Sequence, residues 1–458
     1  MTQSPFLRSL RSLLFICLVF CQQVSAADHP NVLLILADDL GYGDLSCYAC
    51  PDIKTPHIDS LAKQGLRLTN FYSNGPECSP TRTALMTGRY QQRFGGLECA
   101  IGLAGVGRYD DAIRLAAQHE LGLPPQHSVL ARRLKDAGYA TAICGKWHLG
   151  YDAKFLPSKH GFDHFFGPLG GGIDYFRHNE PGGEHMLYLN DDKVHREGYS
   201  TDLIAAEACQ FLRRTKDKPF LLYVPFNAPH SPFQGPDDKD LSATNAENFN
   251  RGKRETYIKM VERLDDRIGT ILKTLDETGA SQNTLVIFSS DNGGPANSRN
   301  DPFSGRKGTT YEGGIRVPCL LRWPGQLAAG RESSQMGITM DLTASILNLA
   351  GAKPTAVQPI AALPLDGIDL VTHLRESKPN VPRNLFWRQR RGENTWRGVR
   401  AGNLKLVSKQ DGKSREDWLF DLSQDIAEKS DLRTSRPADA NRLKDLLTRW
   451  EAEVEPIR

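Results

Sequence analysis

Short apolar segments that end abruptly in polar residues constrain the fold of this chain more than any other feature of its sequence. The segment Asn31–Ala37 is an almost unbroken apolar run, and Asp38 and Asp39 follow it directly. Runs of this length and composition are typical of strands that are buried on both faces of a parallel sheet. Three similar runs are predicted to be strands of the same kind, and they cover residues 139–144, 220–224 and 284–288.

Helical patterns lie between these segments. The clearest covers Arg254–Glu277, where apolar residues repeat at helical spacing, and shorter ones cover His57–Gln64 and Ser128–Asp136. Strands that alternate with helices predict an α/β fold, with a large, doubly wound and mostly parallel sheet flanked by helices. Ligands bind at the edge formed by the carboxyl ends of such strands, so we expect the polar residues that follow the four runs to converge there.

The pattern changes after about residue 380, where short strands with polar turns replace the alternation. A closing helix is predicted over Pro437–Val454, and the Ala- and Pro-rich stretch Ala350–Leu363 is the expected connector. We therefore expect a large α/β domain over residues 27–350, then the connector and a smaller α+β subdomain with an antiparallel sheet over residues 351–458. The short strands predicted there are Asn384–Arg388, Thr395–Val399, Leu404–Ser408 and Trp418–Leu422.

The N-terminus has the pattern of a secretory signal peptide. Arg8 and Arg11 precede the apolar run 13–20, and small residues follow at 24–27. We predict that residues 1–26 are removed and that the protein is secreted or periplasmic. A membrane anchor is the alternative, but the run is too short to span a bilayer comfortably, and no later stretch is apolar enough. The formal net charge of +3 is close to neutral and gives no reason to expect a nucleic-acid partner.

Seven cysteines remain after the predicted signal peptide is removed, which would place them in an oxidising compartment. Cys47 and Cys50 are spaced for either a tight disulfide or a redox pair. Zinc is not expected, because no second Cys/His pair completes a site. Cys144 and Cys319 lie in apolar runs and are expected to be core residues.

Cys78 begins the segment Cys78-Ser-Pro-Thr-Arg82, which continues into an apolar pair and the dipeptide Thr87-Gly88. This segment resembles the nucleophile motif of the sulfatase family, within the alkaline-phosphatase-like superfamily. One position departs from that pattern, because Glu77 stands where the family usually has a small or apolar residue. Without its context the motif would indicate only a buried cysteine in a proline turn.

The resemblance implies that a formylglycine-generating enzyme oxidises Cys78 to formylglycine. In such sulfatases one hydroxyl of the hydrated aldehyde attacks sulfur, and the other later expels sulfate. By the same resemblance, Arg82 pins the hydrated aldehyde and the adjacent loop.

Four oxygen-bearing residues at strand ends form a candidate metal site. Asp38 and Asp39 follow one predicted strand, and Asp291 and Asn292 follow another. Carboxylate and amide oxygens suit Ca²⁺ or Mg²⁺ and suit zinc poorly. The resemblance favours calcium, with residue 78 completing the ligand set. Taken singly, the first pair could be a helix cap or turn, and the second a loop.

Two further pairs of cationic and imidazole side chains match segments of the family. Lys146 and His148 stand in Gly138–His148, and the resemblance assigns them to a sulfate oxygen and to the diol proton. His230 and Lys307 would bind sulfate and donate to the leaving alcohol, a pairing that suits charge developing on that oxygen. The plainer interpretations are a surface lysine, a half-buried histidine, a turn and a flexible loop.

The combination predicts a sulfuric ester hydrolase that acts on aryl sulfates or on sulfated sugars and glycans. A phosphodiesterase or phosphonate hydrolase with the same modified residue, and a non-enzymatic binding protein, are the alternatives. Asp174, Arg177 and His178 either line the substrate pocket or belong to a solvated loop. The sugar, the sulfate position and exo or endo action are not predicted from this sequence.

Overall fold

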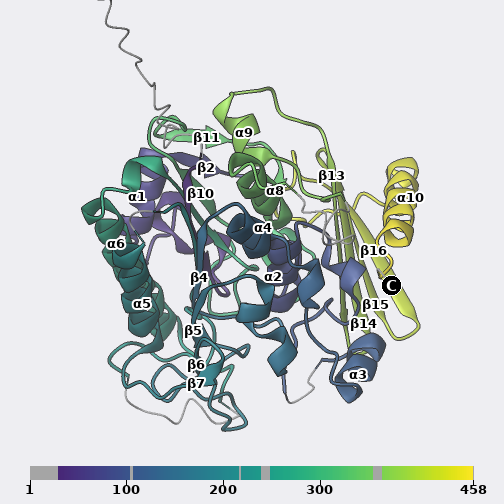
Figure 1. Ribbon diagram of the computed structural model, residues 1–458. Coiled ribbons are helices and arrows are strands. Elements are labelled where there is room, and N and C mark those ends of the chain that lie inside the picture. The colour runs from purple at the N-terminus through teal and green to yellow at the C-terminus, as the bar shows by residue number, and fades with distance from the viewer. Residues whose placement is uncertain (1–28, 104–106, 216–217, 239–247, 354–363, 457–458) are drawn as a thin grey trace, which may run out of the picture.

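A computed structural model describes residues 29–103, 107–215, 218–238, 248–353 and 364–456. It contains a ten-stranded sheet with helices on both faces, and a separate four-stranded sheet with a helix at the C-terminal end (Figure 1). The predicted signal peptide, 1–26, lies outside the described residues, as does most of the predicted connector. The α/β class, the large sheet and the smaller antiparallel sheet with its helix are confirmed.

Five parallel strands form the centre of the large sheet. In spatial order they are β9 (Thr284–Ser290), β1 (Asn31–Ala37), β8 (Phe220–Pro225), β4 (Ala140–Cys144) and β5 (His164–Pro168). Antiparallel pairing occurs toward both edges, through β10 (Cys319–Arg322), β6 (Leu187–Leu189) and β7 (Asp192–Lys193). The remaining short strands are β2 (Leu66–Leu68), β3 (Phe71–Tyr72), β11 (Arg331–Ser333) and β12 (Gly337–Ile338).

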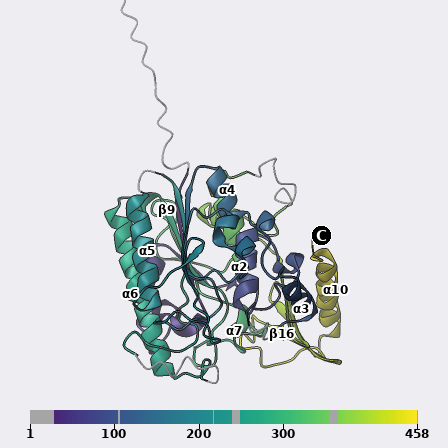
Figure 2. The same ribbon diagram turned by 60° about the horizontal axis from the view of Figure 1, so that its bottom comes forward.

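Helices cover both faces of this sheet, as Figure 2 shows. One face packs against α1 (Pro56–Gln64), α5 (Ser200–Arg214) and α6 (Arg254–Glu277). The other packs against α2 (Cys78–Thr87), α4 (Leu130–Asp136) and α8 (Thr339–Leu349). Shorter helices are α3 (Asp110–Ala117), α7 (Glu312–Ile315) and α9 (Leu370–Arg375).

The side chains of β1 explain why its sequence is a continuous apolar run. Val32, Leu34 and Leu36 join the core under α2, α4 and α8. Leu33 and Ile35 join the core under α1, α5 and α6, on the opposite face. Successive side chains of a strand point to opposite faces, so a strand with helices on both sides needs apolar residues at every position.

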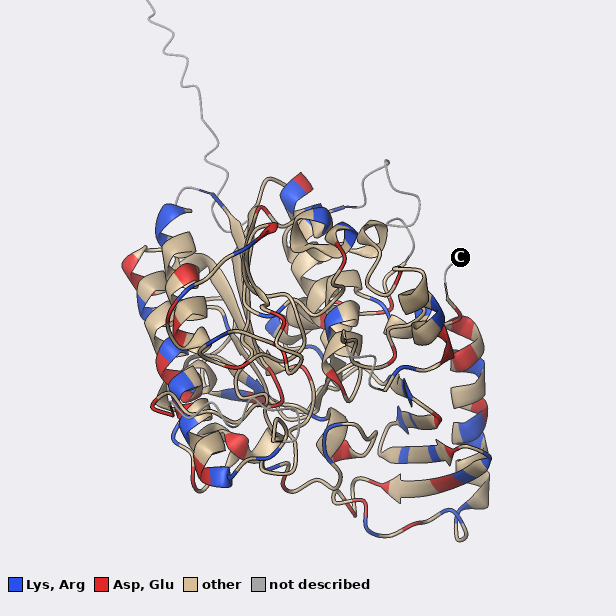
Figure 3. Ribbon diagram, turned by 90° about the horizontal axis from the view of Figure 1, so that it is seen from below, with Lys and Arg blue, Asp and Glu red and all other residues tan. Residues whose placement is uncertain are grey.

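The C-terminal sheet is an antiparallel meander of four strands, and α10 (Pro437–Glu453) packs against it. Its core is continuous with that of the large domain, because Trp387 and Trp450 belong to the same apolar cluster as Tyr72 and Ala84. Acidic and basic residues are interspersed along the outer helices and these strands (Figure 3). The four strands are β13 (Asn384–Arg391), β14 (Asn394–Ala401), β15 (Leu404–Asp411) and β16 (Ser414–Asp421).

All seven cysteines in the described residues are free thiols. Cys144 and Cys319 are fully buried, as expected of core residues. Cys50 donates to the Asp52 carboxylate at 3.2 Å, and Cys47 is not joined to it by a disulfide. Among the described helices, none combines the length and apolar character needed to cross a bilayer.

A fully buried lysine joins the C-terminal sheet to α7. The Nζ atom of Lys405 lies 2.7 Å from a carboxylate oxygen of Glu312 and 2.9 Å from one of Glu428. Burial raises the pKa of Glu428 to about 7, against the opposing effect of Lys405. Replacing Lys405 by methionine leaves two buried carboxylates without their shared cation, so we expect a loss of about 3–5 kcal/mol in unfolding free energy, measured by denaturant titration.

Lys409 on the same strand provides the control. Its side chain is partly exposed, and its Nζ atom lies 3.6 Å from Asp411. Lys409→Met should therefore cost less than about 1 kcal/mol. Equal stability losses in the two variants would show that the buried cluster has no special role.

Candidate active site

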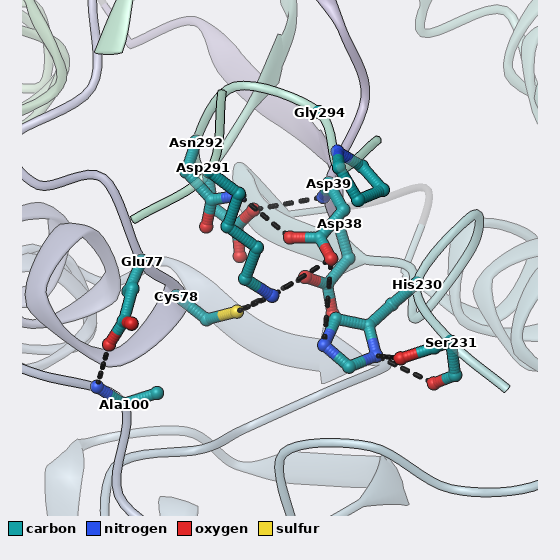
Figure 4. A network of polar contacts seen from close by, with 12 residues as sticks. Asp38, Asp39, Glu77, Cys78, Ala100, His230, Ser231, Asp291, Asn292 and Gly294 are labelled. Carbon is teal, nitrogen blue, oxygen red and sulfur yellow. Dashed lines mark hydrogen bonds and ion pairs between the residues drawn. The ribbon is translucent and has the colours of Figure 1, made fainter. Parts of the chain in front are cut away.

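The carboxyl ends of the central strands gather the predicted site residues at one edge of the sheet. Asp38 and Asp39 follow β1, and Asp291 and Asn292 follow β9. Loops after the neighbouring strands β4 and β8 and before α7 bring four more residues, and the first two turns of α2 add two. These six residues are Lys146, His148, His230, Lys307, Cys78 and Arg82. Figure 4 shows the centre of this group.

A cavity of about 590 Å³ opens onto these residues. Cys78, Asp39, His148, His230 and Lys307 contribute to its wall. Lys146, Arg82 and Asp38 lie beneath them and are almost completely buried. The ten predicted residues thus form one site, in which some side chains line the cavity and others support them from beneath.

Cys78 is the first residue of α2 and lies at the bottom of the cavity. Its Sγ atom donates to Asp38 Oδ1 at 3.3 Å and lies 3.8 Å from Lys307 Nζ. Burial and the Asp38 carboxylate raise the pKa of the thiol well above its ordinary value. A thiol that stays protonated is a poor nucleophile, so the side chain as encoded is poorly suited to attack an ester.

The acidic residues form a compact cluster around Cys78. Ligand atoms of Asp38, Asp39, Cys78 and His230 all lie within 4.8 Å of one another. Asn292 Nδ2 donates to Asp39 at 2.7 Å, which joins the β9 loop to this group.

Asp291 has a different set of contacts. Its Oδ1 atom accepts from the Asp39 backbone N–H at 3.3 Å. Its Oδ2 atom accepts two hydrogen bonds from Arg82, at 2.8 and 3.0 Å. One carboxylate oxygen thus faces the acidic cluster, while the other anchors Arg82.

The donors at this site suit a hard divalent cation. Three carboxylates meet in a buried place, and the only other side-chain oxygen in the predicted ligand set is that of Asn292. Its Oδ1 atom is buried and has no hydrogen-bond partner among the described residues. An oxygen-rich set with an unsatisfied carbonyl fits Ca²⁺ or Mg²⁺ better than zinc. The predicted ligand set did not include His230, although its ligand atom lies within 4.8 Å of those of Asp38, Asp39 and Cys78.

Lysines pair with the two carboxylates that follow β1. Lys146 Nζ donates to Asp38 Oδ2, and Lys307 Nζ donates to Asp39 Oδ2 at 2.8 Å. Although burial raises the pKa of Asp39, Lys307 and His230 outweigh it and hold this pKa at about 2. Burial and the nearby Asp291 instead raise the pKa of Asp38. The site therefore contains two lysines whose positive charges lie close to the carboxylates that follow β1.

The two histidines are held in defined orientations. The Nε2 atom of His148 lies 2.6 Å from the carbonyl oxygen of Ile101, which makes Nε2 the donor and leaves the buried Nδ1 as an acceptor. Burial and Lys146 lower the pKa of His148 well below its usual value. In His230, Nδ1 faces the carbonyl of Ser231 at 2.6 Å, and burial and Lys307 lower the pKa to about 4. Both rings are neutral at pH 7 and can accept a proton.

Asp174, Arg177 and His178 are not among the residues that line the cavity. Asp174 is buried and accepts hydrogen bonds from the backbone N–H groups of Phe176, Arg177 and Asn179. Arg177 lines a separate cavity instead. Asp174 therefore organises a turn, which is a role that neither interpretation of the sequence had given it.

Several cavity residues were missed by sequence reasoning. Glu77 precedes Cys78 and accepts from the Ala100 backbone N–H at 2.7 Å. Glu180 accepts from the Tyr151 hydroxyl at 2.6 Å, and Arg391 reaches the cavity from the C-terminal sheet. These residues come from loops and from a different sheet, where no periodic pattern links them to the strand ends.

Comparison with known proteins gives the class to which this fold and site belong. The sequence model of the sulfatase family matches residues 30–352, and the chain belongs to that family. A second family model, "N-sulphoglucosamine sulphohydrolase, C-terminal", matches residues 305–453. The resemblance carried by the Cys78 segment is thereby confirmed.

Sequence comparison with curated proteins identifies individual sulfatases that this chain resembles. The chain is 36% identical to N-acetylgalactosamine-6-sulfatase of Rattus norvegicus over 401 residues, which cover 83% of this chain and 71% of the relative. It is 36% identical to the Canis lupus familiaris enzyme over 76% of this chain, and spans 66% of that relative's length. Steryl-sulfatase of Mus musculus is 34% identical, with 76% and 65% covered. These relatives indicate a sulfuric ester hydrolase.

Solved structures share this fold. The crystal structure of Ps i-CgsB has a TM-score of 0.79 and 31% identity, with 92% of this chain and 93% of that chain covered. A complex of the same protein with k-i-k-neocarrahexaose matches with a TM-score of 0.78. The phosphonate monoester hydrolase of Agrobacterium radiobacter, at 20% identity and a TM-score of 0.63, shares the fold.

Proposed function

We propose that this protein is a secreted or periplasmic sulfatase that hydrolyses sulfate monoesters of sugars, through a formylglycine made from Cys78 and a bound calcium ion. The observation that carries the proposal is the position of Cys78. It lies at the bottom of the cavity, against Asp38 and Lys307, with His148 and His230 in the wall.

Calcium is the metal we assign, with magnesium as the alternative. Asp38, Asp39, Asp291, Asn292 and residue 78 would hold it, and the unsatisfied oxygen of Asn292 supports this set. When bound, the ion would lower the pKa of a hydroxyl on residue 78 and hold a sulfate oxygen. Arg82 has a positioning role, because it binds both Asp291 and the backbone carbonyl of Lys146.

Formylglycine supplies the nucleophile that the protonated thiol of Cys78 does not. As a hydrated aldehyde, residue 78 would carry two hydroxyl groups, of which one attacks sulfur and the other later releases sulfate. The maturation partner is therefore a formylglycine-generating enzyme. The raised pKa of the buried thiol supports the need for this conversion.

The surrounding side chains bind the ester and move its protons. Lys307, which lines the cavity, would pair with a sulfate oxygen, and Lys146 would contribute its positive charge from beneath the cavity wall. The free Nδ1 of His148 accepts the proton of the second hydroxyl of residue 78. Protonated Lys307 would donate to the leaving oxygen and stabilise the negative charge that develops as the ester bond breaks, and His230 would donate there once it has taken up a proton.

A sulfated saccharide is the substrate class that the relatives favour. Two of them are named for N-acetylgalactosamine 6-sulfate, and a similar structure holds a neocarrahexaose. The cavity volume of about 590 Å³ lies in the range of small-molecule binding sites and suits the sulfated end of a saccharide. Steroid sulfates are the other class named among the relatives.

The test is a desulfation screen with protein co-expressed with a formylglycine-generating enzyme. Sulfate release is measured for defined sulfated saccharides, an aryl sulfate and a steroid sulfate, and compared with turnover of an aryl phosphodiester. We expect a saccharide sulfate to be hydrolysed with kcat/KM at least about 100-fold above that for the diester, which corresponds to about 2.7 kcal/mol. Faster diester turnover, or no sulfate release from any ester, would refute the proposal.

A further inference from the structure

Glu77, the acidic residue directly before Cys78, has a defined place in the cavity wall. Its side chain is buried, and both carboxylate oxygens have partners. Oε2 accepts from the backbone N–H of Ala100 at 2.7 Å, and Oε1 lies 2.8 Å from Nη1 of Arg391. The residue that departs from the usual motif therefore holds a guanidinium group beside the nucleophile.

Arg391, at the end of β13, is fixed from a second side by Gly107. A Cβ atom at position 107 would lie 2.7 Å from Cζ of Arg391, so the guanidinium occupies space that only glycine leaves open. Gly107 also has a φ of +78°, and its carbonyl accepts from the N–H of Gly392 at 3.1 Å. Arg391 thus packs against Gly107 and pairs with Glu77 where it lines the cavity.

Arg391 still has donors to offer. Its side chain is 42% exposed and lines the same cavity as Cys78. Of the five N–H donors of a guanidinium, Glu77 engages one. A planar group with donors along two edges can bind a second carboxylate or sulfate while it keeps the first partner.

A second arginine lines the cavity close to the Glu77 loop. Arg306 is exposed, and its side chain makes no hydrogen bond or ion pair with any described residue. Its loop is tied to the loop of Glu77, because Gly308 N–H donates to the carbonyl of Pro76 at 2.9 Å. The neighbouring Lys307 is engaged with Asp39, so Arg306 is the available cation of this loop.

The cavity wall also includes apolar surface. Phe233, Phe249 and Leu103 line it, and Leu103 is 49% exposed. Sugar rings have apolar faces that pack on such side chains, whereas a small inorganic anion needs none. The cavity therefore combines a place for a ring with cations away from the reacting sulfate.

We propose that Arg391, together with Arg306, forms a subsite for a second anionic group on the saccharide whose sulfate ester lies at residue 78. The group is a carboxylate or another sulfate, and the substrate is thus a polyanionic saccharide. The inference rests on the proposed sulfatase function and adds the residues that select among sulfated sugars. If Glu77 and Arg391 formed only a structural bridge, their loss would weaken all ligands equally.

Binding to the Cys78→Ala protein, measured by calorimetry in the presence of calcium, tests the subsite without any turnover. One pair of probes is chondroitin 6-sulfate disaccharide, which carries a uronate, and its carboxyl methyl ester. The other pair is N-acetylgalactosamine 4,6-disulfate and the 6-sulfate. We expect the probe with the second anion to bind about 10-fold more tightly in at least one pair, as one further charge-assisted contact predicts.

In the same background, Arg391→Gln should reduce that ratio to about 2 or less, and Arg391→Lys should restore part of it. Arg390→Gln is the matched control, because Arg390 is the preceding residue of β13, lies over the Tyr109 ring at 4.4 Å and does not line the cavity. This control should keep the full ratio. Thermal unfolding of each variant separates a loss of recognition from a loss of stability.

Equal affinities within both pairs, no measurable binding of any probe, or a ratio that survives Arg391→Gln would overturn the subsite. Failure of the proposed function gives a different result, namely no sulfate release in the desulfation screen with the matured enzyme. A sulfatase without the subsite would release sulfate and still bind both members of each pair equally. The two experiments therefore report separately on the reaction and on its selectivity.

Discussion

Cys78→Ala is expected to lower kcat/KM for a sulfate ester by at least about 10⁴-fold, because alanine cannot be converted to the formylglycine that supplies the nucleophile. The fold should survive the change. Cys78 is buried, but its thiol makes only weak contacts with Asp38 and Lys307, so unfolding free energy should change by about 1–2 kcal/mol at most. Sulfate release and thermal unfolding, measured on the same preparation, check both expectations.

A second cysteine separates the chemistry from the loss of a buried thiol. Cys209 lies on α5, is 3% exposed, and contacts Thr274 rather than any cavity residue. Cys209→Ala should therefore keep the parent rate. If Cys78→Ala retained the parent sulfatase rate, the assignment of residue 78 as the nucleophile would be wrong.

Maturation provides an independent check on Cys78. Mass spectrometry of the peptide that bears this residue should show an aldehyde in active preparations. The unmodified thiol should dominate when no formylglycine-generating enzyme is present, and that protein should be mostly inactive. Full activity with an unmodified thiol would mean that the encoded side chain is itself competent.

The central part of the fold could be predicted because its physical signals are local. β1 and α6 have the predicted bounds, Asn31–Ala37 and Arg254–Glu277. A strand covered on both faces needs an unbroken apolar run, and a helix covered on one face needs apolar residues at helical spacing. In both cases the pattern of apolar residues along the element shows which of its faces are buried.

Helices that are buried on all sides, and very short edge strands, were not predicted. All ten residues of α2 are buried, and nine of the eleven in α8 are. A helix enclosed on every side has no polar face, so helical spacing does not stand out. The two- and three-residue strands at the sheet edges, such as β7 and β11, are too short to carry a period-two pattern.

Only the site residues that follow strands or belong to recognisable motifs could be predicted from the sequence. The carboxyl-edge rule placed Asp38, Lys146, His230 and Asp291 together, although they are far apart in sequence. The neighbouring contact between Asp39 and Asn292, for example, spans 253 positions. The contact of Glu77 with Arg391 spans 314 positions and joins the residue before α2 to the C-terminal sheet. No rule of periodicity or strand order relates those two residues, so tertiary structure was needed to find them.

Asp291→Asn is expected to weaken calcium binding and activity together, with a loss of kcat/KM of at least about 100-fold. The amide keeps the shape of the side chain but removes a negative charge from the proposed ligand set. It also leaves one acceptor oxygen where Arg82 and the Asp39 N–H use two, and it removes the negative charge that pairs with buried Arg82, so stability should fall by about 3–5 kcal/mol. Calorimetric titration with calcium, unfolding and turnover are measured in parallel.

The control for this variant must lose a buried carboxylate outside the site. Asp265 on α6 accepts from the backbone N–H groups of His57 and Ile58, and burial raises its pKa to about 6. Asp265→Asn should lower stability without changing calcium affinity, whereas Asp291→Asn should lower both. Removing calcium from the parent enzyme with a chelator should abolish turnover, and adding it back should restore the rate. If chelation left the rate unchanged, the oxygen cluster around Asp38 would have to act through Lys146 and Lys307 alone, and the metal assignment would be wrong.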